Sequence, residues 1–361
     1  MSVFTLSDVR EQTYKPRDSW WTVYLVDPLA SRLVQVTANR TSLTPNQLTL
    51  AALVLGLGAA GCFAMAEWPW LLAGALLFHF SFVLDCMDGK IARLKGNGSI
   101  FGSWLDYVFD RLRVLVCAVA LMGGQYALTG EQVFAWCTLG IVFTDMFRYL
   151  NSPQMAKVRV GMRKRLTRAI REAGEAAYGD GEEVGSAAGA HERLNADLGG
   201  RRVEDAAVYL RAELDDDEFG EDTAQDPRLR AREVQATELQ RSFNSRFPWY
   251  ARFRDTLREH RVRPHLFSGI EFQMGCFIVA PVVGAFSTTG MLLVIGVSAM
   301  LMMAFELLLV YKLWLSTKEF SRVLAGIEET APHGGHGVPQ AADAETDERA
   351  DTEVVAAPRA N

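Results

Sequence analysis

The chain has 361 residues, of which 49% are hydrophobic and 22% are charged, and its formal net charge is −6. This length would suit two or three soluble domains, but the apolar residues gather in long runs, which argues against that organisation. The net charge indicates no partner, and we expect no nucleic acid. The chain has no phosphate-binding loop, no Ser-His-Asp order and no zinc-type cysteine pair.

Residues 1–18 form a polar N-terminal arm without the apolar core of a cleavable signal peptide. Between residues 19 and 40, apolar side chains recur at helical spacing, beginning with Trp20, Trp21 and Tyr24. This pattern predicts an amphipathic helix in the cytoplasmic membrane interface. The alternative is a short helix in a soluble core.

Six apolar runs each approach the roughly 20 residues that a helix needs to cross a bilayer. The runs are 48–66, 70–92, 104–123, 131–150, 267–287 and 290–314. Thr44 suits the N-cap of the first helix, and Pro45 suits its first turn. The sequence therefore predicts an all-α membrane protein with six transmembrane helices, four of them in residues 44–150 and two in residues 264–316.

The charge of the loops predicts the orientation. The loops at 67–70, 123–131 and 286–290 contain no Lys or Arg, whereas the opposite side carries Arg93, Lys95 and a basic run over 157–168. The positive-inside rule places that basic side, with both termini, in the cytoplasm.

A long cytoplasmic insert, residues 151–263, separates the fourth and fifth predicted helices. It is basic at both ends and acidic in the middle, and its composition predicts partial disorder. The basic ends suit either contact with anionic lipid or an ordinary topology signal. Residues 317–361 form a predicted disordered cytoplasmic tail.

Four aspartates lie where the second and third apolar helices meet, namely Asp85, Asp88, Asp106 and Asp110. Their i, i+3 and i, i+4 spacings put each pair on one helix face. The turn between the helices is short, so we expect antiparallel neighbours whose carboxylates converge at one depth. Ionisable groups at membrane depth indicate function, and oxygen ligands favour Mg²⁺, Mn²⁺ or Ca²⁺. Two pairs of carboxylates could hold two ions.

A purely structural role for these aspartates would require basic partners. Lys90, Arg93, Arg111 and Arg113 are close in sequence, but helical geometry does not place all of them on the acidic face. Gly89 and Gly102 permit close approach of a ligand or of another helix.

The string Asp85-x2-Asp88-Gly89-x2-Ala92-Arg93-x8-Gly102-x3-Asp106-x3-Asp110 resembles the signature of the CDP-alcohol phosphatidyltransferase family. The resemblance covers about residues 19–150 and 264–316. It implies a six-helix fold, usually a homodimer, with a membrane-embedded site open to the cytoplasm. It also implies that a CDP-linked donor gives its phosphoryl-alcohol to an acceptor hydroxyl, with release of CMP.

The resemblance assigns roles by position. It implies that Asp85, Asp88 and Asp106 are metal ligands, and that Asp110 is a ligand and the base for the acceptor hydroxyl. The residues that it places at the nucleotide and diphosphate are Gly89, Arg93 and Gly102, with a weaker match at Asn46 and Thr49.

We expect CDP-diacylglycerol as the donor, a small polar alcohol, phosphorylated or not, as the acceptor, and Mg²⁺ or Mn²⁺ as the cofactor. Candidate acceptor-pocket residues are Arg148, Lys157 and Glu271, with Asp145, Arg159, His265 and Gln273 beside them. Arginine suits a phosphate, although charges at helix ends also snorkel to the interface. The alternatives are transfer of a CDP-linked head group to diacylglycerol or another polyol, a divalent-cation transporter, and an inactive scaffold.

Overall fold

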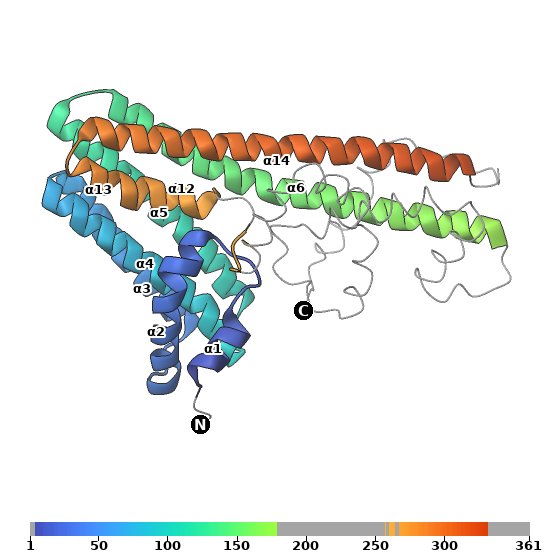
Figure 1. Ribbon diagram of the computed structural model, residues 1–361, viewed down its shortest axis with the longest axis horizontal. Helices are drawn as coiled ribbons and strands as arrows, with labels where there is room; N and C mark the ends of the chain where they lie inside the picture. The colour runs from blue at the N-terminus through green and yellow to red at the C-terminus, as the bar shows by residue number, and fades with distance from the viewer. Residues whose placement is uncertain (1–3, 179–256, 258–259, 264–266, 331–361) are drawn as a thin grey trace, which may run out of the picture. The chain divides into compact units, whose positions relative to one another are not determined.

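The computed structural model describes residues 4–178, 257, 260–263 and 267–330 (Figure 1). Within these ranges the regular elements are helices, and an isolated bridge joins Asp18 to Val262. The helices in chain order are α1 Leu6–Thr13, η1 Thr22–Val26, α2 Asp27–Arg40, α3 Pro45–Met65, α4 Trp68–Lys95, α5 Ile100–Thr129, α6 Val133–Tyr178, α12 Gly269–Met274, η2 Gly275–Val279, α13 Ala280–Gly284 and α14 Thr288–Thr330. The predicted all-helical architecture is confirmed for these residues.

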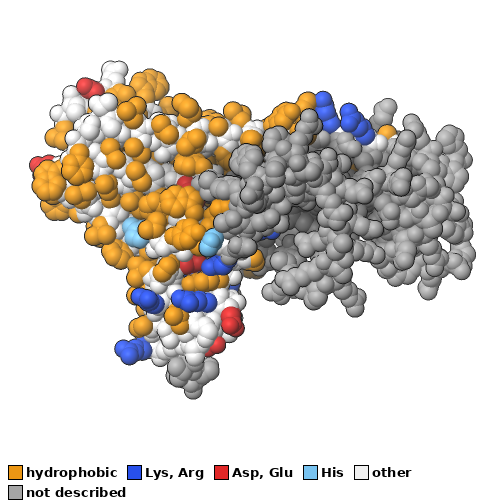
Figure 2. Space-filling model, viewed as in Figure 1, with side chains coloured by type: hydrophobic (Ala, Val, Ile, Leu, Met, Phe, Trp, Pro, Cys, Tyr) orange, Lys and Arg blue, Asp and Glu red, His pale blue; other side chains and the backbone are white. Residues whose placement is uncertain are grey.

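Five helical stretches are long and apolar enough to cross a membrane: Pro45–Met65, Trp68–Lys95, Ile100–Thr129, Val133–Leu166 and Thr288–Arg322. A shorter apolar stretch, Gly269–Gly284, combines α12, η2 and α13 and corresponds to the predicted fifth span. Large hydrophobic side chains are exposed on these helices, as Figure 2 shows for one face, and such a surface suits lipid. The chain is an integral membrane protein on these grounds, and its count of six crossings stays a prediction.

The start of α3 follows from its local sequence. The Thr44 hydroxyl accepts a hydrogen bond from the backbone N–H of Gln47, and the Gln47 side chain accepts one from the backbone N–H of Thr44 at 3.0 Å. This reciprocal capping box satisfies two N–H groups that the helix leaves unpaired. The predicted N-cap at Thr44 and the Pro45 first turn are confirmed.

Small residues let α3 lie close to both helices that carry the aspartates. Ala52, Gly56, Ala59 and Ala60 are buried along α3. We expected α4 and α5 to pack side by side, but both rest mainly on α3. Flat surfaces of small side chains allow such close backbone approach, which is how helices associate without a hydrophobic driving force in lipid.

A short turn joins α4 to α5, as the sequence predicts. Gly96 ends α4 in the left-handed region with φ 61°, a conformation that glycine adopts without steric cost. Ser99 then caps α5, and its hydroxyl accepts a hydrogen bond from the backbone N–H of Gly102 at 2.9 Å. Because the turn is short, the end of α4 and the start of α5 lie close together. Both were predicted to lie on the cytoplasmic side.

The N-terminal segment is helical and packs against α4. The segment expected as a polar arm contains α1, in which Val9 is fully buried. A π-helical turn, η1, precedes α2, and Pro28 occupies the first turn of α2. The predicted helix within residues 19–40 is present, while its place in the membrane interface stays a prediction.

Asp27 anchors this N-terminal segment through two cations from distant parts of the chain. Lys90 of α4 lies 2.9 Å from Asp27 Oδ1, and both side chains are buried. Arg261 donates to Asp27 Oδ2 at 3.3 Å and to the Lys15 carbonyl oxygen at 2.9 Å. The backbone of Asp18 pairs with this same stretch, accepting from Arg263 N–H at 3.0 Å. The segment before α12 is therefore attached to the N-terminal helices.

The described residues fall into two compact units. One contains residues 4–158 and the described residues from 257 to 315, and the other contains residues 159–178 and 316–330. Helices α6 and α14 continue to Tyr178 and Thr330, so residues 151–178 of the predicted insert and residues 317–330 of the predicted tail are helical. The remainder of the predicted insert and tail lies outside the described residues, apart from residues 257 and 260–263.

Adjacent glycines of α5 offer a matched test of the packing between α3 and α5. A Cβ at Gly124 would lie 2.7 Å from the Ala64 carbonyl oxygen and 2.8 Å from that of Phe63, whereas one at Gly123 would meet nothing within 4 Å. We expect Gly124→Ala to destabilise the purified protein by about 1–3 kcal/mol, because backbone must move. Gly123→Ala should be neutral or stabilising by up to about 1 kcal/mol. Thermal unfolding in detergent measures both, and equal stabilities would contradict the packing.

Candidate active site

The four aspartates lie at adjoining ends of α4 and α5, within the first unit. Asp85 and Asp88 belong to the last turns of α4, and Asp106 and Asp110 belong to the first turns of α5. Asp106 lies close enough to the other three for their charges to interact. Helix spacing and the short turn therefore gather four carboxylates in one region, as the sequence predicts.

The start of α3 contributes two polar side chains to this region. The Thr49 hydroxyl donates a hydrogen bond to Asp88 Oδ2, and both residues are buried. Asn46 lies against Gly102, where an added Cβ would stand 2.7 Å from the Asn46 amide oxygen. The structure thus places Thr49 beside Asp88 and Asn46 beside Gly102, although these two residues gave the weaker match to the family signature.

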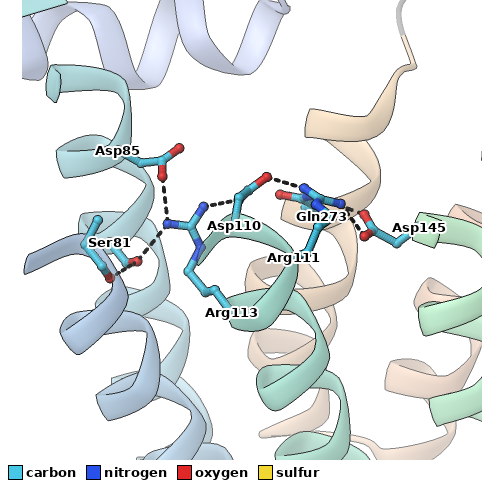
Figure 3. Close-up of polar contacts among 8 residues, drawn as sticks. Ser81, Asp85, Asp110, Arg111, Arg113, Asp145 and Gln273 are labelled. Atoms are coloured by element: carbon cyan, nitrogen blue, oxygen red, sulfur yellow. Dashed lines mark hydrogen bonds and ion pairs between the residues drawn. The ribbon is translucent and has the colours of Figure 1, made fainter. Parts of the chain in front are cut away.

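Arg113 connects the two aspartate-bearing helices (Figure 3). Its Nη1 donates to Asp85 Oδ1 at 3.1 Å and to the Ser81 hydroxyl at 3.3 Å. Its Nη2 donates to Asp110 Oδ1. The side chain is only 2% exposed, so a buried cation stands between one carboxylate of each helix.

A second arginine extends the network toward α6. Arg111 donates to Asp110 Oδ2 and, through its other terminal nitrogen, to Asp145 Oδ2. Asp145 also accepts from the Gln273 amide of α12 at 3.3 Å. The Arg111 guanidinium carbon lies 3.3 Å from the centre of the Tyr149 ring, a cation–π contact. Both oxygens of Asp110 therefore accept hydrogen bonds from arginines.

The reach of these two arginines differs from the expectation. The nearby cations were not all expected on the acidic face, yet Arg111 and Arg113 both contact its carboxylates. The signal was available, because Arg113 stands at i+3 from Asp110, the spacing that also pairs Asp85 with Asp88. A buried carboxylate without a partner is costly, which explains why the fold supplies guanidinium groups.

The donor chemistry suits a hard divalent cation, but the arrangement does not complete a site for one. In the described part of the chain, no group of three or more His, Cys, Asp or Glu side chains is placed to hold a metal ion. Arg113 stands between Asp85 and Asp110, and Thr49 engages Asp88. The predicted ligand set is gathered, but some of its oxygens already have protein partners.

Gly89 and Arg93 border the cluster on the exposed side of α4. A Cβ at Gly89 would meet only the Arg93 guanidinium, at 3.9 Å, within the 4 Å around it. Arg93 itself is exposed. The missing side chain leaves room beside an exposed guanidinium, which is an arrangement that suits a phosphate group.

The acceptor-pocket candidates have different surroundings. The Arg148 guanidinium packs against the Gly269 backbone and lies 5.0 Å from the centre of the Tyr149 ring. Its Nε is buried and has no hydrogen-bond partner in the described residues. Glu271 caps α12, accepting from the backbone N–H of Ser268 at 2.9 Å and from its hydroxyl at 2.6 Å. Lys157 is exposed on α6, Arg159 belongs to the second unit, and His265 lies outside the described residues.

The sequence of this region is similar to known proteins. Residues 42–170 match the sequence model of a family described as CDP-alcohol phosphatidyltransferase. This stretch includes all four aspartates, Gly89, Arg93, Gly102 and both arginines of the network.

Several curated relatives match over the same part of the chain. A phosphatidylinositol phosphate synthase of Mycolicibacterium smegmatis is 38% identical over 95 residues, which cover 25% of this chain and 41% of the relative. An archaetidylinositol phosphate synthase of Methanothermobacter thermautotrophicus is 29% identical over 105 residues, covering 28% of this chain and 52% of the relative. A CDP-diacylglycerol–glycerol-3-phosphate 3-phosphatidyltransferase of Cereibacter sphaeroides is 38% identical over 104 residues, covering 28% and 46%. The chain thus spans about half the length of these relatives.

The hydrogen bond between Thr49 and Asp88 gives a prediction about stability. Thr49→Val removes the hydroxyl but keeps the branched shape, so the buried Asp88 loses a donor. We expect a loss of about 1–3 kcal/mol in the free energy of unfolding. Thr49→Ser, which keeps the hydroxyl, should retain most of the stability. Thermal unfolding of the detergent-solubilised variants measures this, and a Val variant as stable as the Ser variant would contradict the contact.

Proposed function

Because residues 42–170 form a domain of the CDP-alcohol phosphatidyltransferase family, we propose that the chain transfers a phosphatidyl group from CDP-diacylglycerol to a small polar alcohol and releases CMP. The observation that carries this proposal is the gathering of Asp85, Asp88, Asp106 and Asp110 beside Gly89 and Arg93, inside the stretch that matches the family. The reaction belongs to phospholipid biosynthesis.

The position of the cluster supports a lipid-linked donor. The aspartates stand at the ends of helices long enough to cross a membrane. A donor whose acyl chains remain in the bilayer can therefore present its diphosphate to Gly89 and Arg93, where a glycine leaves room beside a guanidinium. The name of the Cereibacter sphaeroides relative specifies CDP-diacylglycerol as its donor.

We propose a phosphorylated acceptor. The names of two relatives specify phosphatidylinositol phosphate and archaetidylinositol phosphate as products, and the name of a third includes glycerol 3-phosphate. Arg148 supplies a partly buried guanidinium whose Nε has no protein partner in the described residues. Arginine binds phosphate with paired N–H donors, and an unpaired buried donor is costly, so a bound phosphate would satisfy it.

The chemistry requires a base and neutralisation of negative charge. The acceptor oxygen forms a bond to the phosphorus of the phosphatidyl group, the bond from that phosphorus to the CMP oxygen breaks, and a carboxylate takes the hydroxyl proton. We assign this role to Asp110. Each Asp110 oxygen accepts one hydrogen bond from an arginine, which leaves a second lone pair on each oxygen for the acceptor hydroxyl.

A divalent cation, Mg²⁺ or Mn²⁺, remains part of the proposal, with Asp85, Asp88, Asp106 and Asp110 as its candidate ligands. Bound there, it would neutralise charge on the diphosphate and on the leaving CMP. The loop charges and the family resemblance support a site open to the cytoplasm, both termini on that side, and a homodimer.

An acceptor panel tests the proposed function. Purified protein receives CDP-diacylglycerol, Mg²⁺ and, in turn, inositol phosphate, glycerol 3-phosphate, unphosphorylated inositol, glycerol and serine, with CMP release as the measurement. We expect turnover with a phosphorylated acceptor. Arg148→Met should lower kcat/KM for that acceptor by about 10- to 100-fold through loss of a charged hydrogen bond, and Arg148→Lys should lose less.

Other results of the panel would point to other functions. With CDP-choline or CDP-ethanolamine as donor and diacylglycerol as acceptor added to the panel, CMP release from these donors alone would establish transfer of a head group to diacylglycerol. Absence of CMP from every CDP donor, together with metal flux into proteoliposomes, would establish a transporter.

The assignment of Asp110 gives a separate prediction. Asp110→Asn keeps the shape and one acceptor oxygen but removes the base, so turnover should fall by about 10²- to 10⁴-fold. Binding of CDP-diacylglycerol should be largely spared. Asp88→Ala and Asp106→Ala should weaken metal-dependent donor binding as well as turnover. Single-turnover kinetics and equilibrium donor binding measure the two effects, and normal turnover in Asp110→Asn would exclude this residue as the base.

A further inference from the structure

A cation belonging to the protein stands inside the aspartate cluster. Arg113 contacts Asp85 of α4 and Asp110 of α5 with its two terminal nitrogens, and only 2% of its surface is exposed. It therefore occupies the space between carboxylates of two different helices. Figure 3 shows the guanidinium directed into this space from α5.

The surroundings of Arg113 fix it in this position. Its aliphatic stem crosses α3 at Gly56, where an added Cβ would lie 2.6 Å from the arginine Cδ and 2.7 Å from its Cγ. Ser81 donates its own hydroxyl hydrogen to the Ala52 carbonyl oxygen at 2.6 Å, so its oxygen is free to accept from Arg113. Residues of three helices thus shape one site for this guanidinium.

This arrangement explains why the aspartates do not form a metal site in the structure. A guanidinium and a divalent ion both need the lone pairs of Asp85 and Asp110, and two cations within a few ångströms repel one another. The Arg113 Nε is buried and has no hydrogen-bond partner in the part of the chain that the structure describes. The guanidinium is thus held by its two carboxylates and Ser81.

We propose that Arg113 is a built-in cation of the aspartate cluster that competes with divalent metal for Asp85 and Asp110, and so weakens metal binding by the nucleotide-free protein. The inference rests on the proposed function only in taking divalent metal as a ligand of these carboxylates. It makes Arg113 a positioning residue, because it acts on the carboxylates and not on the substrate.

Binding of Mn²⁺ tests the inference without any measurement of turnover. Full-length protein in detergent is titrated with Mn²⁺ in the absence of nucleotide, and free Mn²⁺ is followed by electron paramagnetic resonance. We expect Arg113→Met to bind Mn²⁺ about tenfold more tightly or better than wild type, because a competing charge has been removed. Arg40→Met, which removes an exposed charge at the end of α2, is the matched control and should leave the Kd unchanged.

A second variant keeps the Arg113 charge but displaces the guanidinium. Gly56→Ala places a methyl group against the Arg113 stem and should also tighten Mn²⁺ binding. A third variant, Arg113→Lys, keeps a charge at this position and should have a Kd closer to that of wild type. Gly56→Ala decides the question if Arg113→Met does not fold. Equal Kd values for wild type and the folded variants would overturn the inference. Absence of Mn²⁺ binding in every variant would overturn it together with the metal part of the proposed function, while CMP release in the acceptor panel would still stand.

Discussion

The guanidinium of Arg113 between Asp85 and Asp110 links the two helices on which the site is built. Four carboxylates at adjoining helix ends repel one another, and burial makes that repulsion stronger than it would be in water. Arg113 and Arg111 offset it, and Arg111 carries the network on to Asp145 of α6. The candidate active site is therefore a shared set of charges contributed by several helices. Its properties depend on how the arginines and any bound cation divide the carboxylate oxygens.

The helix α3 makes this arrangement possible because it presents so little bulk. Both aspartate-bearing helices rest on it, and its buried alanines and Gly56 allow them to approach closely. Gly56 leaves space for the stem of Arg113, and the first turns of α3 carry Thr49 to Asp88 and Asn46 to Gly102. Helix α3 thus packs against both helices, supplies Asn46 and Thr49, and leaves room at Gly56 for the stem of Arg113. A larger side chain at position 56 would displace the stem of Arg113, and with it the guanidinium between Asp85 and Asp110.

Much of the fold follows from regular patterns in the sequence. The apolar runs predicted the long helices, Thr44 and Pro45 predicted the start of α3, and the spacing of the four aspartates predicted their convergence. The sequence did not reveal that α4 and α5 would both pack mainly against α3. Contacts between helices depend on the side-chain volumes of all three helices. The sequence also did not reveal the arginine network, since the path of a long flexible side chain is set by its tertiary surroundings. Glu271 shows the same limit, because the sequence did not reveal that its side chain would cap α12.

Two basic residues of α4, Lys90 and Arg93, have different surroundings. Lys90 points to the buried Asp27, where Arg261 also binds, while Arg93, less than one helical turn later, is exposed beside Gly89. One short stretch of α4, residues 89–93, therefore lies beside a prospective substrate and also holds the N-terminal helices. The ion pair between Lys90 and Asp27 joins those helices to the stretch of α4 that carries Arg93. Through Asp27, the N-terminal helices and the stretch preceding α12 are thus attached to the helix on which the chemistry is proposed.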